Sequence, residues 1–481
     1  MKDLREWMQA LRGIGELIEV DAPVDPHLEI TEIADRVMKE GGPALLFRNV
    51  IGSDLPVLIN QFGSERRMAM GLGGADLDEI AGRIAQIAQM QPPQGLMDKV
   101  KALGTLKDLA SLGTRTVRSA PCQEVVMRGD DVDLDQIPIL TCWPGDGGPF
   151  VTLPLVFSHD PRTGARNCGM YRVQKVDRHT CMMHWQVHKD GRQHLLDSEG
   201  RVPVAVAIGT DPAVTYAATA PLPPALDEMM FAGFLRGERV EMVKAVTQDI
   251  EVPARAEVVL EGYVDATDIR DEGPFGDHTG FYTPVDQYPA FHVTGITMRR
   301  DAIYSTTIVG MPPMEDYWLG KATERLFLPL IRMTVPDLVD MNLPLEGVFH
   351  NCAIVSVRKR YPGHAKKLIN AVWGLGLLSL TRCVIVVDED IDVQDVSQVA
   401  FRAFSNVDPG RDVLVVDGPV DALDHAAPWP AYGAKIGFDA TAKWEGEGQV
   451  RPWPEEIRMS DEVRARVDAR WSEFGIPSPG R

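Results

Sequence analysis

The hydrophobic pattern of this chain changes twice along its length, and these changes constrain the fold more than any other feature. Up to about Gly113, apolar residues recur at helical spacing, with short apolar strands between the helices. From Gln123 to Met298 the chain carries short strand-like runs separated by turn signals. A long helical segment follows, and after it strands and helices alternate. Since 481 residues are also too many for one core, we predict an α/β fold in several domains.

These changes divide the chain into four predicted segments: an N-terminal α/β module at 1–113, a β-rich domain at 114–312, a linker helix at 313–335 and a C-terminal α/β module at 336–481. The β-rich domain should be a barrel or sandwich with one helix at 225–235, and the turn 160–164 should join two of its strands as a hairpin. Its expected strands are 123–127, 153–158, 167–176, 181–187, 202–208, 258–264 and 291–298. In the C-terminal module we expect strands at 348–357, 383–387 and 413–416, with helices at 364–378 and 396–404.

Charge and cysteine usage exclude several classes of protein. The net charge of −20 argues against binding to nucleic acid phosphates or to an anionic membrane surface. The six cysteines are scattered without C-x-x-C spacing, so we expect reduced thiols in a cytoplasmic protein. The amino terminus is charged and amphipathic, unlike a signal peptide. The apolar run 368–381 is too short to span a bilayer and is expected to be a buried helix.

Two acids, Glu272 and Asp277, flank a Gly-Pro-Phe-Gly turn whose proline and phenylalanine should bury it. Because two acids close together in a partly apolar site cannot both ionise freely, we expect one of them to hold a proton near neutral pH. A protonated acid beside an ionised one is what a general acid–base step requires. The alternative is an ordinary acidic turn.

The segment Asn167–Arg172 should supply the partner of these acids. If it forms one strand, period-two alternation places Cys168, Met170 and Arg172 on a common face, so that Arg172 points among apolar neighbours. A buried guanidinium must be paired, and leaving it unpaired would cost about 3–5 kcal/mol. The acidic turn is the natural source of carboxylates for it.

A further cluster indicates a metal ion. His188 lies near His184 in a His-Trp-Gln-Val-His run, and Glu228 opens a helix. Together with Asn167, His188 and Glu228 form a mixed nitrogen and oxygen set that suits Mn²⁺ or Mg²⁺ better than zinc. For His184 an exposed polar hairpin is an equal alternative, and Glu228 taken singly could simply stabilise the helix dipole. The same helix end would also favour a phosphate.

Together, these segments resemble the UbiD-type decarboxylases that use prenylated FMN. The Asn-x-Gly-x-x-Arg segment, the histidine after the tryptophan, the helix-opening glutamate and the Glu-Gly-Pro-Phe-Gly-Asp turn occur in the family's order, and the resemblance covers nearly the whole chain. It implies a central split β-barrel flavin-binding domain, prenylated FMN as the cofactor, Mn²⁺ (or Mg²⁺) at its phosphate and K⁺ nearby. It also implies a homodimer or homohexamer built through the C-terminal module.

The resemblance further implies roles for individual residues. Arg172, Glu272 and Asp277 match the catalytic arginine–acid–acid network, with Asp277 in the proton-donor position. The implied flavin-lining residues are Met170, Tyr171, Arg172, His184, Trp185, Gln186, Lys189 and Asp190, and the implied metal ligands are Asn167, His188 and Glu228. Arg382 stands where a lysine is common near the flavin, and since the two side chains differ in shape we do not count it in the site.

The implied reaction is the non-oxidative, reversible decarboxylation of an aromatic acid, with CO₂ released and a flavin prenyltransferase supplying the cofactor. The expected substrate is a polyprenylated hydroxybenzoate or a naphthoate precursor of ubiquinone or menaquinone. A small phenolic acid of the vanillate or 4-hydroxybenzoate type is the alternative. From a different class, the chain could bind flavin and metal without turnover, but a carrier has no need of buried acids. We expect a cytoplasmic enzyme that lies at the membrane surface if its substrate is polyprenylated.

Overall fold

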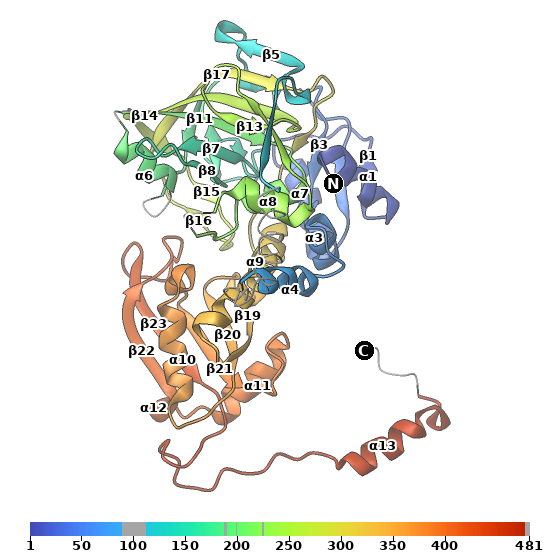
Figure 1. Ribbon diagram of the computed structural model, residues 1–481, viewed down its shortest axis with the longest axis vertical. Helices are drawn as coiled ribbons and strands as arrows, with labels where there is room; N and C mark the ends of the chain where they lie inside the picture. The colour runs from blue at the N-terminus through green and yellow to red at the C-terminus, as the bar shows by residue number, and fades with distance from the viewer. Residues whose placement is uncertain (89–111, 187–189, 199, 224–225, 477–481) are drawn as a thin grey trace, which may run out of the picture.

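The computed structural model describes residues 1–88, 112–186, 190–198, 200–223 and 226–476. The N-terminal and β-rich parts form the upper body in Figure 1, and the C-terminal module lies below them. The two bodies are joined by the long helix α9 (Glu315–Thr334). The predicted mixed α/β class is confirmed.

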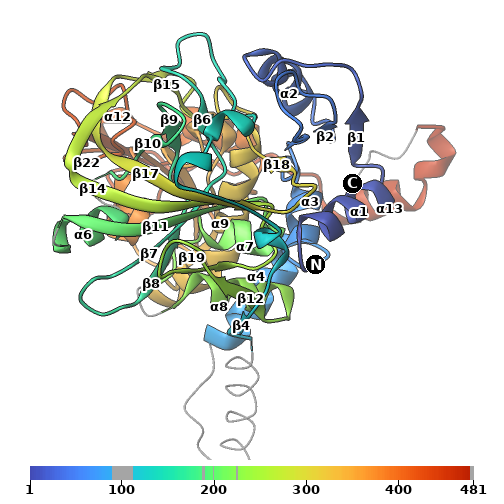
Figure 2. The same ribbon diagram turned by 90° about the horizontal axis from the view of Figure 1, so that it is seen from above.

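The N-terminal module is a small sheet with helices, and Figure 2 shows its helices α1 and α2 to one side of the central sheet. Its strand order is β1-β2-β3-β18, in which β18 (Tyr304–Ser305) comes from the end of the β-rich domain and pairs in parallel with β3. The two modules therefore share a sheet. The strands that precede the β-rich domain are β1 (Leu17–Val20), β2 (Ala44–Phe47) and β3 (Val57–Ile59), and the helices are α1 (Leu4–Gly13), α2 (Glu29–Lys39), α3 (Glu65–Gly71) and α4 (Leu77–Ala88).

The β-rich domain is built on a nine-stranded sheet. Its path runs β6-β9-β10-β17-β14-β11-β7-β8, with β5 added to β17, and among the described strands it does not close on itself. The predicted hairpin at 160–164 joins β7 to β8. The strands are β5 (Val125–Arg128), β6 (Phe150–Val151), β7 (Leu155–His159), β8 (Arg166–Gly169), β9 (Val173–Lys175), β10 (Thr180–Met183), β11 (Arg201–Ile208), β14 (Val258–Glu272) and β17 (Asp286–Met298).

Smaller elements cover this sheet. A second sheet has the order β13-β12-β4, with strands Glu251–Pro253, Val240–Lys244 and Thr114–Val117. The helices are α6 (Asp190–Asp197), α7 (Pro212–Ala217) and α8 (Glu228–Arg236). The helix predicted at 225–235 is α8, and it begins at Glu228 because the Asp227 side chain accepts a hydrogen bond from the Met230 amide and caps it. Residues 224 and 225 lie outside the described residues.

The prediction of one strand at 167–176 was wrong. β8 ends at Gly169 and pairs with β7, whereas β9 begins at Val173 and pairs with β6 and β10 near the other end of the sheet. A Cβ on Gly169 would lie 2.3 Å from the Tyr171 ring, so the chain can fold back tightly only because this residue is glycine. Period-two alternation therefore cannot be carried from Asn167 to Arg172.

The acidic turn lies at the far end of the longest hairpin. β14 and β17 pair from Val258–Met298 to Glu272–Asp286, well beyond the predicted 258–264 and 291–298. The outer half was missed because most of its residues face solvent, which removes the apolar alternation. Two register shifts bend the hairpin, and at one of them Gly262 is needed because its Cβ would meet the His292 carbonyl oxygen at 1.9 Å.

The C-terminal module is a five-stranded sheet with the order β19-β20-β21-β23-β22. Its strands are β19 (Leu338–Asn342), β20 (Cys352–Val357), β21 (Cys383–Asp388), β22 (Val413–Pro419) and β23 (Tyr432–Asp439), and its helices are α10 (His364–Trp373), α11 (Val396–Asn406) and α12 (Pro409–Asp412). β19 and β23 were not predicted. An arm carrying α13 (Asp461–Ala469) extends away from the module (Figure 1).

Two predictions in this module need correction. The helix expected at 364–378 ends at Trp373, since Gly374 caps it and a separate 3₁₀ turn follows at Gly376–Leu380, so the run 368–381 is not a single helix. The strand expected at 348–357 begins only at Cys352. No helix in the described part of the chain is long and apolar enough to cross a bilayer. All six cysteines are free thiols.

Phe157 on β7 is fully buried, whereas Ile51, which lies between β2 and β3, is 55% exposed. We expect Phe157→Ala to lower the free energy of unfolding by about 3–5 kcal/mol, because it removes a buried ring from a close-packed core. Ile51→Ala should change that free energy by less than about 0.5 kcal/mol. Urea denaturation followed by circular dichroism compares the two variants, and equal midpoints would contradict the assignment of this core.

Candidate active site

Arg172 lies between the two acids of the turn. Its Nη2 donates to Glu272 Oε2 at 2.6 Å and its Nη1 to Asp277 Oδ2 at 2.7 Å. The three side chains are 9%, 1% and 9% exposed, respectively. The guanidinium also lies over the ring of Phe275, 4.6 Å from its centroid, and donates to Thr283 Oγ1 at 3.2 Å. The expected pairing of Arg172 with both acids is thus present. Arg172 lies in the segment between β8 and β9, however, and not on a strand as expected.

The protonation expected for this pair is not found. Burial would raise the pKa of Glu272, but the hydrogen bond from His184 and the charge of Arg172 outweigh it, and the pKa is lowered. The pKa of Asp277 is held well below its ordinary value in the same way, by His278 and Arg172 against the effect of burial. The prediction that one acid keeps a proton at neutral pH was therefore wrong, because cationic partners lie between and beside the acids.

A loop before β6 holds the turn in place. Asp146 Oδ1 accepts the Gly276 amide at 2.7 Å, while its Oδ2 accepts the amides of Cys142 and Trp143. The backbones of Gly147 and Gly273 pass so closely that a Cβ on either residue would lie 2.4–2.5 Å from the Cα of the other. Neither Asp146 nor this glycine contact was found from the sequence, because the partners lie about 130 residues apart and no local pattern connects them.

Three of the expected flavin-lining residues, Arg172, His184 and Gln186, connect to this turn through Glu272. His184 Nδ1 lies 2.8 Å from Glu272 Oε2, and the Gln186 amide lies 3.1 Å from His184 Nε2, so His184 belongs to the site and not to an exposed hairpin. Tyr171 and Trp185 are buried, and the Trp185 Nε1 has no hydrogen-bond partner among the described residues. The remaining expected residues are Met170, whose amide bonds to the Ala218 carbonyl, Asp190, which is exposed at the start of α6, and Lys189, which lies outside the described residues.

Two of the three expected metal ligands lie together. Glu228, in the first turn of α8, accepts the Cys168 amide at 3.2 Å and so lies beside Asn167 on β8. Burial raises the pKa of Glu228 to about 7, and the Asn167 amide nitrogen is buried without a partner in the described structure. A desolvated carboxylate beside an unsatisfied amide fits a bound cation and its anionic ligand. His188 lies outside the described residues, and within them no three His, Cys, Asp or Glu side chains form a metal-binding group.

Three further titratable residues near Asp277 were not counted in the predicted site. His278 Nδ1 lies 2.8 Å from Asp277 Oδ1, and His350 from the C-terminal module meets His278. Burial raises the pKa of Asp316, at the start of α9, to about 7. His278 was visible in the sequence as the neighbour of Asp277, whereas nothing local indicates His350 or Asp316.

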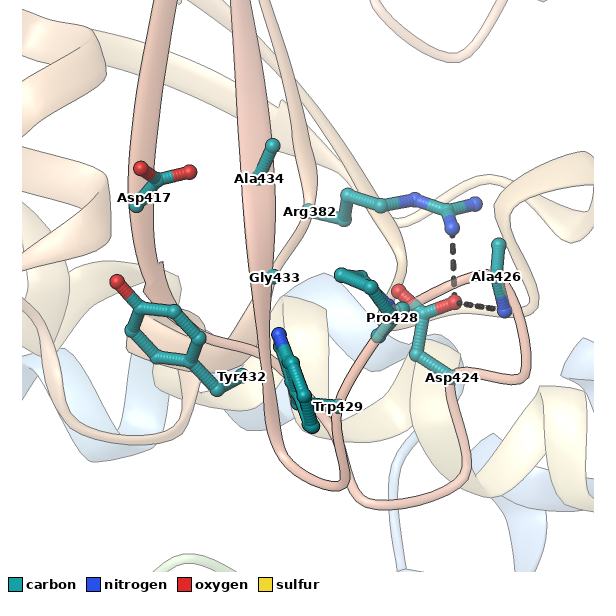
Figure 3. A pocket seen from close by; sticks show the side chains of 10 residues that line it. Arg382, Asp417, Asp424, Ala426, Pro428, Trp429, Tyr432, Gly433 and Ala434 are labelled. Carbon is teal, nitrogen blue, oxygen red and sulfur yellow. Dashed lines mark hydrogen bonds and ion pairs between the residues drawn. The ribbon is translucent and has the colours of Figure 1, made fainter.

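Arg382, which was left out of the expected site residues, pairs within the C-terminal module. Its Nη1 donates to Asp424 Oδ1 at 2.7 Å, and Figure 3 shows the guanidinium directed at this carboxylate. The pocket they line has a volume of about 330 Å³ and is formed by residues of the C-terminal module alone, including Trp429 and Tyr432. The acidic turn contributes none of its lining residues.

Three family models match consecutive parts of the chain. They are described as the N-terminal domain, the Rift-related domain and the C-terminal domain of UbiD, 3-octaprenyl-4-hydroxybenzoate carboxy-lyase, and they match residues 8–87, 115–312 and 317–440. An uncharacterized protein of Archaeoglobus fulgidus is 51% identical over 478 residues, which cover 98% of both chains. One of Aquifex aeolicus is 49% identical over 481 residues, which cover 99% of both.

Solved structures resemble the whole chain. The UbiD-class enzyme HmfF from Pelotomaculum thermopropionicum in complex with FMN is 29% identical, with a TM-score of 0.80, and covers 97% of this chain and 99% of its own. An evolved dimeric form of that enzyme in complex with prFMN is 28% identical, with a TM-score of 0.79, and covers 96% and 98%. Vanillic acid decarboxylase of Sedimentibacter hydroxybenzoicus in its closed form is 27% identical, with a TM-score of 0.85, and covers 98% and 99%.

Arg172→Met should leave two buried carboxylates without their shared cation. We expect a loss of about 3–5 kcal/mol in the free energy of unfolding at pH 7. In the wild type, the lowered pKa values of Glu272 and Asp277 contribute stability that is lost as pH falls through them. In the variant, burial without the cation raises the pKa values of both acids. The difference in the free energy of unfolding between wild type and variant should therefore become smaller as pH falls and the acids become neutral.

Denaturant titrations of both proteins between pH 7 and pH 5 measure this difference. Arg178→Met is the control, because Arg178 pairs with Asp133 at an exposed position and should show no comparable loss. If the difference in the free energy of unfolding between wild type and Arg172→Met stays constant over this pH range, the assignment of Arg172 as the shared cation of both acids is contradicted.

Proposed function

The chain belongs to the UbiD family of carboxy-lyases, and from this premise we propose that it catalyses the non-oxidative, reversible decarboxylation of an aromatic carboxylic acid. One observation carries the proposal: Arg172 is shared by Glu272 and Asp277 in a buried turn. A protein that only carries flavin or metal would have no use for this arrangement, because desolvating three charges is costly. The non-catalytic alternative is therefore disfavoured.

The cofactor we infer is prenylated FMN, held through its phosphate by Mn²⁺ or Mg²⁺, with K⁺ nearby. When bound, the flavin would supply the electron sink for the carbon that loses CO₂. Asn167 and Glu228 would hold the metal, together with His188. The unpartnered Asn167 amide and the raised pKa of Glu228 support this assignment, since a phosphate could accept from the amide and a cation could neutralise the desolvated carboxylate. A flavin prenyltransferase would supply the cofactor.

The side chains around the turn have separate roles in the reaction. Arg172 fixes the two carboxylates relative to each other, and His184 contacts the same Glu272 oxygen, Oε2, as Arg172 Nη2. Asp277 would then deliver a proton from its carboxyl group to the carbon that has lost CO₂. Because its pKa is held low, Asp277 is ionised at rest and must receive that proton within the catalytic cycle.

For the substrate, we infer a polyprenylated hydroxybenzoate or a naphthoate precursor of quinone biosynthesis. Apolar side chains beside the turn support a substrate with a long apolar part: Phe281 is 55% exposed and Met311 is 66% exposed. For the location we infer the cytoplasm, and such a substrate would bring the enzyme to the membrane surface. A small phenolic acid is the second candidate, which the likeness to vanillic acid decarboxylase favours.

We also infer a homodimer or homohexamer built through the C-terminal module. That module exposes large apolar side chains on α11, Phe401 and Phe404, which is a feature of surfaces that associate. The existence of a dimeric form of HmfF supports this inference.

The metal and flavin assignment predicts the behaviour of Glu228→Ala. Without the carboxylate, the cation and therefore the cofactor phosphate lose their anchor, so we expect loss of most of the bound flavin from a protein that remains folded. The protein is produced together with a flavin prenyltransferase, and its flavin content is measured as visible absorbance per chain. Glu238→Ala, beyond the other end of α8, is the control and should keep its flavin. Full flavin content in Glu228→Ala would contradict the assignment.

The reaction is tested by CO₂ release from a polyprenylated hydroxybenzoate, a naphthoate, vanillate and 4-hydroxybenzoate. With the acid that reacts, we expect Asp277→Asn to slow the incorporation of solvent deuterium into the product carbon by about 10²–10⁴-fold, because the amide keeps the shape but cannot donate the proton. Glu272→Gln should also impair turnover, by disturbing Arg172. If Asp277→Asn exchanges at the wild-type rate with normal flavin content, Glu272 becomes the candidate donor.

A further inference from the structure

Two histidines from different modules contact each other next to Asp277. His278 follows Asp277 in the turn, and its Nδ1 lies 2.8 Å from Asp277 Oδ1. On the other side of the same ring, His278 Nε2 lies 2.7 Å from the Nε2 of His350, which belongs to the C-terminal module. Asp277, His278 and His350 therefore form one continuous line of hydrogen bonds across the junction of the two modules.

The geometry fixes the number of protons in this line. Arg172 keeps Asp277 ionised, so the carboxylate only accepts, and His278 must donate from Nδ1. Two imidazole nitrogens 2.7 Å apart cannot both present lone pairs, because these would repel. One proton must therefore lie between His278 and His350. When it resides on His278, that ring is an imidazolium that donates at both nitrogens, to Asp277 and to His350.

We propose that His278 and His350 form a proton relay that recharges Asp277 after each turnover, with His350 as the point of proton entry. This inference rests on the proposed function, in which Asp277 is the donor. His278 acts through Asp277 and does not itself touch the substrate. Because one of the two histidines comes from the C-terminal module, protonation of the product requires contact between the modules.

The step balances in protons and needs no electron donor or acceptor. Decarboxylation consumes one proton for each CO₂ released, and Asp277 is left as the carboxylate. His278, the imidazolium at rest, passes its Nδ1 proton to Asp277 Oδ1 and keeps the shared proton at Nε2, which leaves two neutral rings. When both rings turn over, His278 again directs an N–H at Asp277, and His350 passes its own N–H proton to the His278 nitrogen that faces it. A proton from solvent water then replaces this one at the far side of His350, where Nδ1 is buried with no hydrogen-bond partner among the described residues.

The charges around the two rings favour holding the proton on His278. Besides Asp277, the acids that face His278 are Asp316 of α9 and Asp421 of the C-terminal module, while His350 also faces Asp424. Although burial would lower the pKa of His278, the bond to Asp277 and these charges raise it. Burial and the charge of His278 lower the pKa of His350 to about 4. At rest the shared proton is therefore on His278, next to the group that uses it.

The C-terminal module presents His350 through an unusual backbone. Val348 and Phe349, just before it, both have left-handed backbone conformations, with φ of 50° and 46°, which non-glycine residues rarely adopt. Phe349 stacks on His278 with ring centroids 5.3 Å apart. Strained backbone of this kind persists only where the surrounding structure enforces it, and here it aims His350 at His278.

The first test uses His350→Gln and His278→Asn in the full chain loaded with prenylated FMN. Each amide can still form a hydrogen bond but cannot relay a proton. We expect both variants to keep wild-type flavin content and to incorporate solvent deuterium into the product carbon more slowly, by about 10²-fold for His278→Asn. In the wild type the rate should fall as pH rises through the raised pKa of His278, because the imidazolium is lost, and in His278→Asn this pH dependence should disappear.

His425→Gln is the matched control. His425 comes from the same module as His350 and its ring packs at a tilt on that of Phe281, just after the turn, with ring centroids 3.9 Å apart, but it lies outside the line of hydrogen bonds. It should keep the wild-type rate and pH profile. If His278→Asn and His350→Gln exchange at the wild-type rate while Asp277→Asn does not, the relay is overturned and the proposed function stands.

A second measurement does not depend on turnover. In the full chain labelled with ¹⁵N-histidine, the ring-nitrogen shifts should show His278 protonated at both nitrogens at pH 7, with that proton lost in Asp277→Asn. A neutral His278 in the wild type at pH 7 would overturn the relay even if the enzyme decarboxylates its substrate. Conversely, His278 could prove to be an imidazolium in a protein that releases CO₂ from none of the four substrate acids. In that case the proposed function is wrong, and the protonation of His278 stands.

Discussion

The structure around the candidate site depends on one guanidinium that neutralises two buried carboxylates. Removing such charges from water costs several kcal/mol per ion unless each is closely paired and hydrogen-bonded. Arg172 meets this condition with bonds of 2.6 and 2.7 Å to Glu272 and Asp277, and the Phe275 ring covers its face. The turn and the segment between β8 and β9 are thereby held to one another, and Asp146 holds its own loop to the turn.

This arrangement also explains which parts of the site could be predicted from the sequence. The acids and Arg172 stand in short motifs with unusual residue types, and the fold class follows from hydrophobic patterns of the same local kind. The protonation of the acids could not be predicted in this way, because it depends on His184 and Arg172, which lie 88 and 100 residues from Glu272. Asp146 was missed for the same reason, since its bond to Gly276 spans 130 residues.

Strand predictions failed where the backbone departs from regular alternation. Gly169 lets the chain leave β8, and the bulges of β14 hide a strand that continues to Glu272. Both irregularities serve the site, since the turn at Gly169 precedes Arg172 and the extended β14 ends at Glu272. Local rules are least reliable at such places, because tertiary contacts stabilise a backbone that local propensity does not favour.

The close passage of Gly147 and Gly273 limits how this site can be redesigned. A directed-evolution library that varied either position would consist mostly of chains that cannot close the loop over the turn, whatever the new side chain contributes to the substrate. Variation is better placed at exposed positions such as Phe281 and Met311, where a new side chain meets solvent. The two glycines thus separate the part of the surface that selection for new substrates can explore from the part it must leave unchanged.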